Sequence, residues 1–179
     1  MVDKWWDNSL KQDKLIFVNG TDDMFSWNGG FAFIDSTTSN TIVLDRTIAY
    51  SHIDSTSGTV VINGTNYAYT GSAGSTLTGV TPDPTGEANG SPVLQTVDIH
   101  TNTPASGFNT DFIKVINNQA YCGSYTSRLI YISSNTNFTD YTVPSPRVAG
   151  SPELLTLDGT ACGIGVRQGK AHIGFGSLS

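Results

Sequence analysis

Residues Asn117–Ser133 read NNQAYCGSYTSRLIYIS, and this stretch decides the fold class. Ala120–Gly123 and Leu129–Ile132 are short runs of strand-forming residues, and the polar segment between them is typical of a turn. The stretch therefore predicts two neighbouring strands. Similar patterns occur at Lys14–Trp27 (KLIFVNGTDDMFSW) and Lys170–Ser177 (KAHIGFGS), which suggests a repeated unit.

The two C-terminal copies of this pattern are separated by 51 residues. A period near 50 residues with four short strands is typical of a β-propeller blade. The N-terminal copy matches the same two-strand core, with Phe25 at the position of Tyr131. The aligned residues are Ala120 with Ala171, Gly123 with Gly174, and Ile113–Val115 with Ile164–Val166.

The composition favours strands and turns over helices. Glu occurs only at positions 87 and 153 of the 179 residues, whereas Thr, Ser, Asn and Gly are plentiful. Helices favour Ala, Leu, Glu and Lys, and strands and turns favour the residues found here. We therefore predict an all-β protein of antiparallel sheets with propeller-blade-like hairpin repeats.

The sequence divides into three segments with different residue patterns. Residues 1–35 hold an N-terminal segment and a first blade-like hairpin, and residues 106–179 hold further blade-like repeats. Residues 36–105 are predicted to form a small inserted β subdomain. Within it, Asn63-Gly64 lies between two β-forming runs, which is a strong hairpin signal.

The number of repeats is too small for a complete ring. Propellers have 4–8 blades, and this sequence supplies about two units and a truncated third. Three explanations stay open: the chain is a piece of a longer protein, other subunits complete it, or the sheets form an open assembly. Unpaired strand edges would favour pairing with other chains.

Three stretches, Gly58–Thr85, Arg128–Gly159 and Gly163–Gly176, resemble tail or neck structural proteins of tailed bacteriophages. Proteins of that family carry propeller-like repeats with an intervening small β domain. The resemblance implies a non-enzymatic structural role in the virion, with other virion subunits or copies of this chain as partners. It supplies no binding residues.

An alternative function is a carbohydrate-binding or adhesin module that recognises a host-surface glycan. Exposed tyrosines could stack on sugar rings, and the adjacent tryptophans near the N-terminus could contact another chain. Packing within the protein is the competing interpretation for all of them. The candidate interface residues are Trp5, Trp6, Tyr67, Tyr69, Tyr125 and Tyr141.

Charge and motifs argue against several other functions. The formal net charge is −6, and the nine Lys and Arg residues are scattered, so we expect no nucleic-acid surface. No apolar run reaches the roughly 18 residues of a membrane helix, and no cleavable signal pattern is present. The sequence lacks a nucleophile elbow, and His52, His100 and His172 are not at metal-ligand spacing. We predict no catalytic, metal or cofactor residues.

Two further features have competing interpretations. Cys122 and Cys162 are either two buried thiols or a disulfide between neighbouring strands. The sequons at Asn19, Asn63 and Asn137 are interpreted as turn residues and not as glycan sites.

Overall fold

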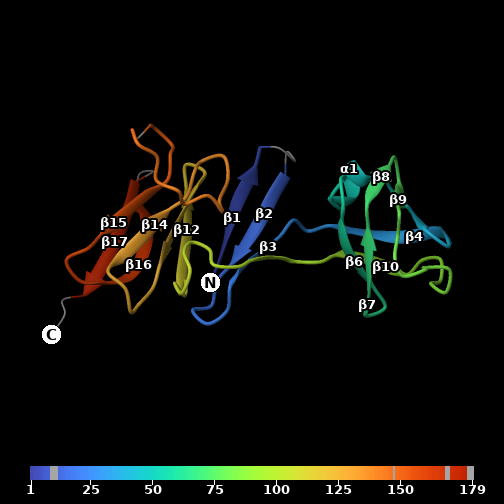
Figure 1. Cartoon of the computed structure of the whole chain (residues 1–179), viewed down its shortest axis with the longest axis horizontal. Coiled ribbons are helices and arrows are strands. Elements are labelled where there is room, and N and C mark those ends of the chain that lie inside the picture. The colour runs from blue at the N-terminus through green and yellow to red at the C-terminus, as the bar shows by residue number, and fades with distance from the viewer. Residues whose placement is uncertain (9–11, 147, 168–169, 177–179) are drawn as a thin grey trace. The chain divides into compact units, whose positions relative to one another are not determined.

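The computed structural model describes residues 1–8, 12–146, 148–167 and 170–176, and its regular structure consists almost entirely of strands (Figure 1). In the described residues one four-residue helix, α1 (Ile48–Ser51), accompanies strands β1 to β17. The strand pairings whose register is described are antiparallel, from the N-terminal β1–β2 pair to the last hairpin. The predicted all-β class is confirmed.

The chain forms two compact units. The first unit comprises Met1–Ser26 and Asp98–Ser179, and the second comprises Trp27–Val97. Strand β4 (Phe31–Thr38) runs across the boundary expected at residues 35 and 36, so the second unit begins before this strand.

The first unit holds two four-stranded sheets and a hairpin. The N-terminal sheet contains β1 (Val2–Asp7), β2 (Gln12–Phe17), β3 (Met24–Trp27) and β11 (Asp98–His100). The central sheet contains β12 (Phe112–Ile116), β13 (Gln119–Gly123), β14 (Leu129–Ile132) and β15 (Glu153–Thr156). The C-terminal hairpin contains β16 (Thr160–Arg167) and β17 (Lys170–Gly176).

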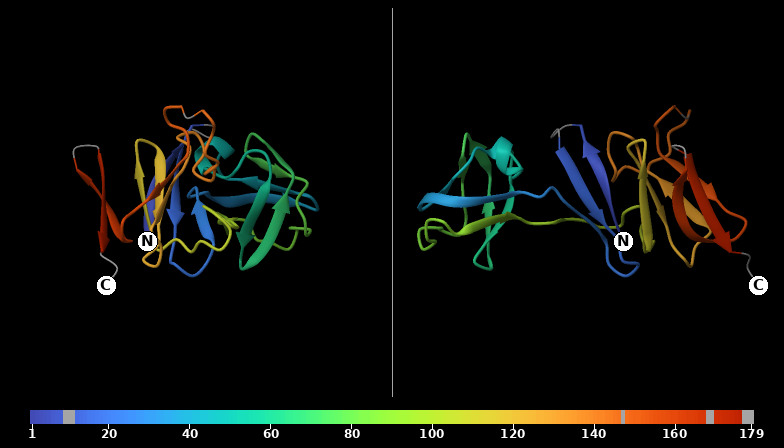
Figure 2. Two further views of the ribbon diagram at one scale, coloured as in Figure 1. Left: turned by 60° about the vertical axis from the view of Figure 1, so that its left-hand side comes forward. Right: turned by 180° about the vertical axis from the view of Figure 1, so that it is seen from behind.

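The central sheet is covered on both faces. Side chains alternate between the two faces of a strand, so Ala120 and Cys122 point to one face while Tyr121 points to the other. Ala120 and Cys122 pack in one core with residues of the N-terminal sheet, and Tyr121 packs in a second core with residues of the C-terminal hairpin. Figure 2 shows the three layers in this order. The first core contains Trp5, Ile16, Val18, Met24, Ile113, Ala120, Cys122 and Phe138. The second core contains Phe112, Ile130, Ile132 and Ala161.

A polar contact also joins the first two layers. The carboxylate of Asp3 on β1 accepts a hydrogen bond from the Val115 backbone N–H at 2.7 Å and lies 2.9 Å from the Lys114 ammonium on β12. Burial raises the pKa of Asp3, but these two partners and a hydrogen bond from the Lys4 backbone N–H together outweigh that effect and leave the pKa below its usual value of 3.8.

The repeat inferred from the sequence is present in the strand register. Five consecutive pairs of the β12–β13 hairpin recur in the β16–β17 hairpin with the same offset of 51 residues. Residues that align in the sequence therefore also have the same register position in the two hairpins. A closed propeller stays a prediction. The pairs are Phe112–Gly123, Ile113–Cys122, Lys114–Tyr121, Val115–Ala120 and Ile116–Gln119, which correspond to Gly163–Gly174, Ile164–Ile173, Gly165–His172, Val166–Ala171 and Arg167–Lys170.

The second unit is a seven-stranded sheet around its own core. Besides β4 it contains β5 (Thr41–Leu44), β6 (Gly58–Ile62), β7 (Thr65–Tyr69), β8 (Gly71–Ala73), β9 (Thr76–Thr78) and β10 (Pro92–Gln95). The predicted hairpin is confirmed, and Asn63 and Gly64 in its turn both have positive φ, at 50° and 84°. Residues 41–50 and 93–100 are each rich in strand-forming residues, but neither forms a single strand. In the first run β5 is followed by α1, and the second divides between β10 and β11, which lie in different units.

The repeat supplies a matched pair of glycines for a packing test. A Cβ added at Gly123 would lie 2.2 Å from Cζ of Phe112, whereas a Cβ at the equivalent Gly174 would meet, among the described residues, only the Gly163 carbonyl oxygen, at 3.9 Å. We expect Gly123→Ala to destabilise the first unit by about 1–3 kcal/mol because its core must shift. Gly174→Ala should change the urea midpoint little. Equal effects of the two substitutions would contradict the described packing.

The Asp3 contact predicts a pH dependence. Because the pKa of Asp3 is lower in the folded protein than the unfolded value of 3.8, its contribution to stability is complete above that pH. The contribution is lost as pH falls further, through the folded pKa. Asp3→Asn should therefore lower the urea midpoint of the first unit at pH 6 and reduce its change between pH 6 and pH 3. Asp35→Asn, at an exposed position of β4, is the control and should leave both quantities unchanged.

Candidate functional site

The N-terminal sheet carries exposed apolar side chains on the face opposite the first core. Trp5, Ile16 and Met24 point into that core, so their immediate neighbours in the strands point the other way. We call this set the outer apolar face. It consists of Val2, Trp6, Leu15, Phe17, Phe25 and Ile99.

Strand pairing and ring stacking bring these residues together. Val2 is the register partner of Phe17, and Ile99 is that of Phe25. The rings of Phe17 and Phe25 stack with centroids 5.1 Å apart and planes 9° from parallel. The exposed fractions are 50% for Val2, 43% for Trp6 and 68% for Ile99. A contiguous exposed apolar surface of this kind is typical of an interaction site.

The central sheet has a face that is equivalent to the outer apolar face of the N-terminal sheet. Tyr131 on β14 aligns with Phe25 on β3, and each lies opposite a residue of the fourth strand, Leu154 or Ile99. Tyr131 packs against the first core, beneath the N-terminal sheet. The outer apolar face is thus the counterpart of a sheet face that another sheet covers.

The six candidate interface residues are divided between core and surface. Trp5, Tyr67 and Tyr69 are only 2%, 5% and 2% exposed, so all three are core residues here. Tyr141 is half-buried beside Cys122. Trp6 and Tyr125 are 43% and 54% exposed, and their contact with a partner stays a prediction.

Sequence reasoning missed most of the outer apolar face. Phe17 and Phe25 were assigned to strands without a face, because a continuous apolar run gives no alternation. The alternation of residues 93–100 (VLQTVDIH) favours one continuous strand, which would place Ile99 in the same strand as Val93. Only the pairing of β11 with β3 places Ile99 beside Phe25, and no local pattern predicts a pairing across an inserted unit.

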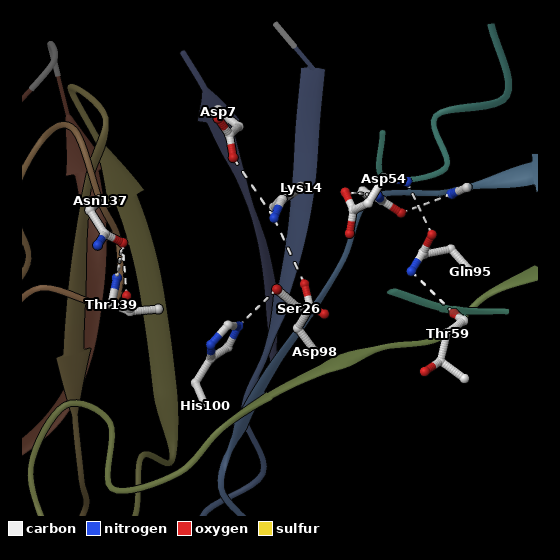
Figure 3. Close-up of polar contacts among 12 residues, drawn as sticks. Asp7, Lys14, Ser26, Asp54, Thr59, Gln95, Asp98, His100, Asn137 and Thr139 are labelled. Carbon is white, nitrogen blue, oxygen red and sulfur yellow. Dashed lines mark hydrogen bonds and ion pairs between the residues drawn. The ribbon is translucent and has the colours of Figure 1, made fainter. Parts of the chain in front are cut away.

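A buried polar pair lies on the inner side of the same sheet (Figure 3). The hydroxyl of Ser26 on β3 lies 2.8 Å from Nε2 of His100 on β11. The His100 ring packs edge-on against Phe138, with centroids 4.9 Å apart, and burial lowers the pKa of His100. Ser26 is 0% exposed, so its hydroxyl is not accessible to a substrate, and the pair holds β11 to β3.

Charged groups surround this pair. The Lys14 ammonium lies 3.8 Å from a carboxylate oxygen of Asp7 and 3.8 Å from one of Asp98 (Figure 3). These contacts link three strands of the sheet. Over the described ranges no group of three or more His, Cys, Asp or Glu side chains has an arrangement that could hold a metal ion.

The second unit contains a separate hydrogen-bond network (Figure 3). The Gln95 side-chain oxygen accepts hydrogen bonds from the Asp54 backbone N–H and the Tyr69 hydroxyl, both at 3.1 Å. Its amide nitrogen donates to the Thr59 carbonyl oxygen at 3.2 Å. All of these partners belong to the second unit. The hydrogen bond to Gln95 satisfies the Tyr69 hydroxyl, so this side chain can be buried without an unpaired polar group.

Two sequons show turn hydrogen bonding. The Asn137 side-chain oxygen accepts from the Thr139 backbone N–H at 3.0 Å and from its hydroxyl at 2.8 Å (Figure 3). The Asn19 side-chain oxygen likewise accepts from the backbone N–H groups of Thr21 and Asp22. Asn137 and Asn19 therefore act as the turn residues that the sequence predicted.

The two cysteines are free and differ in environment. Cys122 is buried next to the Tyr141 hydroxyl, at 3.1 Å, whereas Cys162 is exposed. Burial raises the pKa of the Cys122 thiol to about 12. Cys122 and Cys162 do not form a disulfide. Cys122 is a buried thiol, as the other alternative predicted, whereas Cys162 is not buried.

This difference predicts selective labelling. In the native protein at pH 8, a thiol reagent should modify Cys162 and leave Cys122 unmodified, because the nucleophilic thiolate is suppressed in the core. Mass spectrometry should show one label per chain before denaturation and two after it. Cys162→Ser should abolish native labelling. Rapid modification of Cys122 in the folded protein would contradict the described core.

In the part of the chain that the structure describes, no helix is both long enough and apolar enough to cross a membrane. Comparison of the chain with protein-family models, curated protein sequences and solved structures gave no match.

Proposed function

We propose that this protein is a non-enzymatic structural component of a phage virion, in the tail or neck, that assembles with neighbouring subunits through its β-sheets. The observation that carries the proposal is the outer apolar face of the N-terminal sheet. A single sheet face carries Trp6, Phe17 and Phe25, and the same face of the next layer is covered by a sheet.

The chemistry of the outer apolar face suits contact with protein. Aromatic side chains bury about 150–250 Å² each and are enriched in the central part of interfaces. Burial of apolar surface stabilises by about 25 cal/mol per Å², which makes covering this face favourable. The face also lacks a large net charge, since Lys4 and Asp13 beside Trp6 pair with each other at 3.1 Å.

The virion assignment follows from the resemblance of three stretches of the sequence to phage tail or neck proteins. Partners are then other virion subunits or copies of this chain. The glycan-binding alternative has less support, because Tyr67 and Tyr69, two of the residues expected to stack on sugars, lie in the core of the second unit.

The association of the purified protein tests this proposal. We expect self-association that strengthens with concentration in light scattering coupled to size exclusion, and incorporation into purified phage particles. Phe25→Lys should weaken self-association at least tenfold, because it buries a charge in the contact. Tyr50→Lys, at a position 80% exposed in the second unit, is the matched control and should have no effect.

Two results together would overturn the proposal: a strictly monomeric protein at all concentrations, and its absence from purified particles. Equal association of the Phe25 and Tyr50 variants would instead show that the outer apolar face is not the contact surface.

A further inference from the structure

Both edge strands of the N-terminal sheet contact the next layer through an ionisable side chain. The strand order of this sheet is β1-β2-β3-β11, so β1 and β11 are its edges. On β1, Asp3 binds the Val115 backbone N–H and the Lys114 ammonium of the central sheet. On β11, the His100 ring packs against Phe138, a member of the first core. The sheet is thus held to the next layer at each edge by a group whose charge depends on pH.

The hydrogen bond between Ser26 and His100 defines the charge state in which the β11 contact is stable. Ser26 is 0% exposed, and within the described residues its hydroxyl bonds only to Nε2 of His100, at 2.8 Å. The hydroxyl hydrogen therefore has an acceptor only when Nε2 carries no proton. Protonation turns this nitrogen into a donor and leaves the Ser26 O–H unpaired in the interior, which is unfavourable.

Burial of the imidazole ring acts in the same direction. Desolvation of the half-buried ring lowers the pKa of His100 below its usual 6.5, Asp98 opposes this effect, and the Lys14 ammonium adds to it. Lys14 lies 3.8 Å from the carboxylates of both Asp98 and Asp7. The negative charge of Asp98 is therefore shared with Lys14 and does not compensate for the burial of an imidazolium.

We propose that acid releases the N-terminal sheet from the central sheet, through protonation first of His100 and then of Asp3. Release uncovers the face of the central sheet that carries Ala120 and Cys122 in the first core. An apolar sheet face that is covered at neutral pH thereby becomes accessible in acid. All of these contacts lie within the first unit, so the release is independent of the proposed function.

The two groups act in separate pH ranges. Since the pKa of His100 is below 6.5 in the folded protein, the released state takes up the proton more readily, and the β11 contact weakens as pH falls below 6.5. The pKa of Asp3 is below 3.8 in the folded protein, so the β1 contact is complete above that value and is lost as pH falls through the folded pKa. Release should therefore begin below pH 6.5 and increase further below pH 3.8.

Labelling of Cys122 measures the release, because this thiol is 0% exposed in the first core. The reagent is dithiodipyridine, which reacts with thiols at acid pH, and the protein carries Cys162→Ser so that Cys122 is its only thiol. Each rate is divided by the rate for the urea-unfolded protein at the same pH, which removes the effect of thiolate concentration. We expect this ratio to rise at least about threefold between pH 7.5 and pH 5. An unchanged ratio would overturn the inference.

Substitutions assign the two steps. His100→Gln should lose most of the rise between pH 7.5 and pH 5, because glutamine can accept the Ser26 hydrogen bond but does not titrate. Asp3→Asn should instead keep this rise and lose the further increase below pH 3.8. His172→Gln, the same substitution on the exposed face of β17, is the matched control and should behave as the parent. Equal profiles for the His100 and His172 variants would overturn the inference.

Hydrogen exchange distinguishes release from unfolding of the whole chain and needs no variant. After correction for the intrinsic pH dependence of exchange, the Val115 amide, which Asp3 binds, should lose protection at pH 5. The amides of β1 and β2 should also lose protection, because a sheet without cover is less stable. Those of Gly58–Ile62 in the second unit should stay protected. Equal loss of protection in both units would show global unfolding and overturn the inference.

Discussion

The structure of the first unit depends on the burial of both faces of the central sheet. A four-stranded sheet with apolar residues on two faces has no solvent-facing side, so it is stable only between two other layers. Cys122 and Tyr121, adjacent on β13, serve different cores for this reason. The N-terminal sheet and the C-terminal hairpin supply the cover, although they are far apart in the sequence.

The same principle explains why the ends of the stack are the regions of functional interest. The N-terminal sheet has one covered face and one exposed face that retains aromatic residues, while the C-terminal hairpin has His172 and Gly174 on its exposed face. The two outer surfaces therefore differ in chemistry, with aromatic side chains on one and a histidine and a glycine on the other. An assembly that uses both would join unlike surfaces, which is the geometry of rings and filaments and not of two-fold dimers.

Much of the architecture could be predicted from local sequence. Strand β14 has the bounds expected for it, and the offset of 51 residues corresponds to identical register in two hairpins. Strand β1 was not predicted, because its charged residues obscure the apolar pattern. The structure shows that one of these, Asp3, faces the central sheet and is satisfied by Val115 and Lys114.

The candidate surface was harder to predict than the fold. Trp6 was identified as an interface candidate, but so was Trp5, because the sequence does not say which of two adjacent residues faces the core. Phe25 and Ile99 meet through a pairing that spans the whole second unit. Local periodicity carries no information on such a contact, whereas it does for Tyr67 and Tyr69, which share the buried face of one strand.

The register pairing of Ser26 with Asp98 determines where the second unit is inserted. These residues flank the second unit and are antiparallel register partners, so the insertion leaves and rejoins the N-terminal sheet at adjacent points, about 4.5–5.5 Å apart between Cα atoms. Any domain whose own termini lie that close together could occupy this place without altering the strand register. A different domain could therefore replace the second unit between β3 and β11 while the stacked layers of the first unit stay the same.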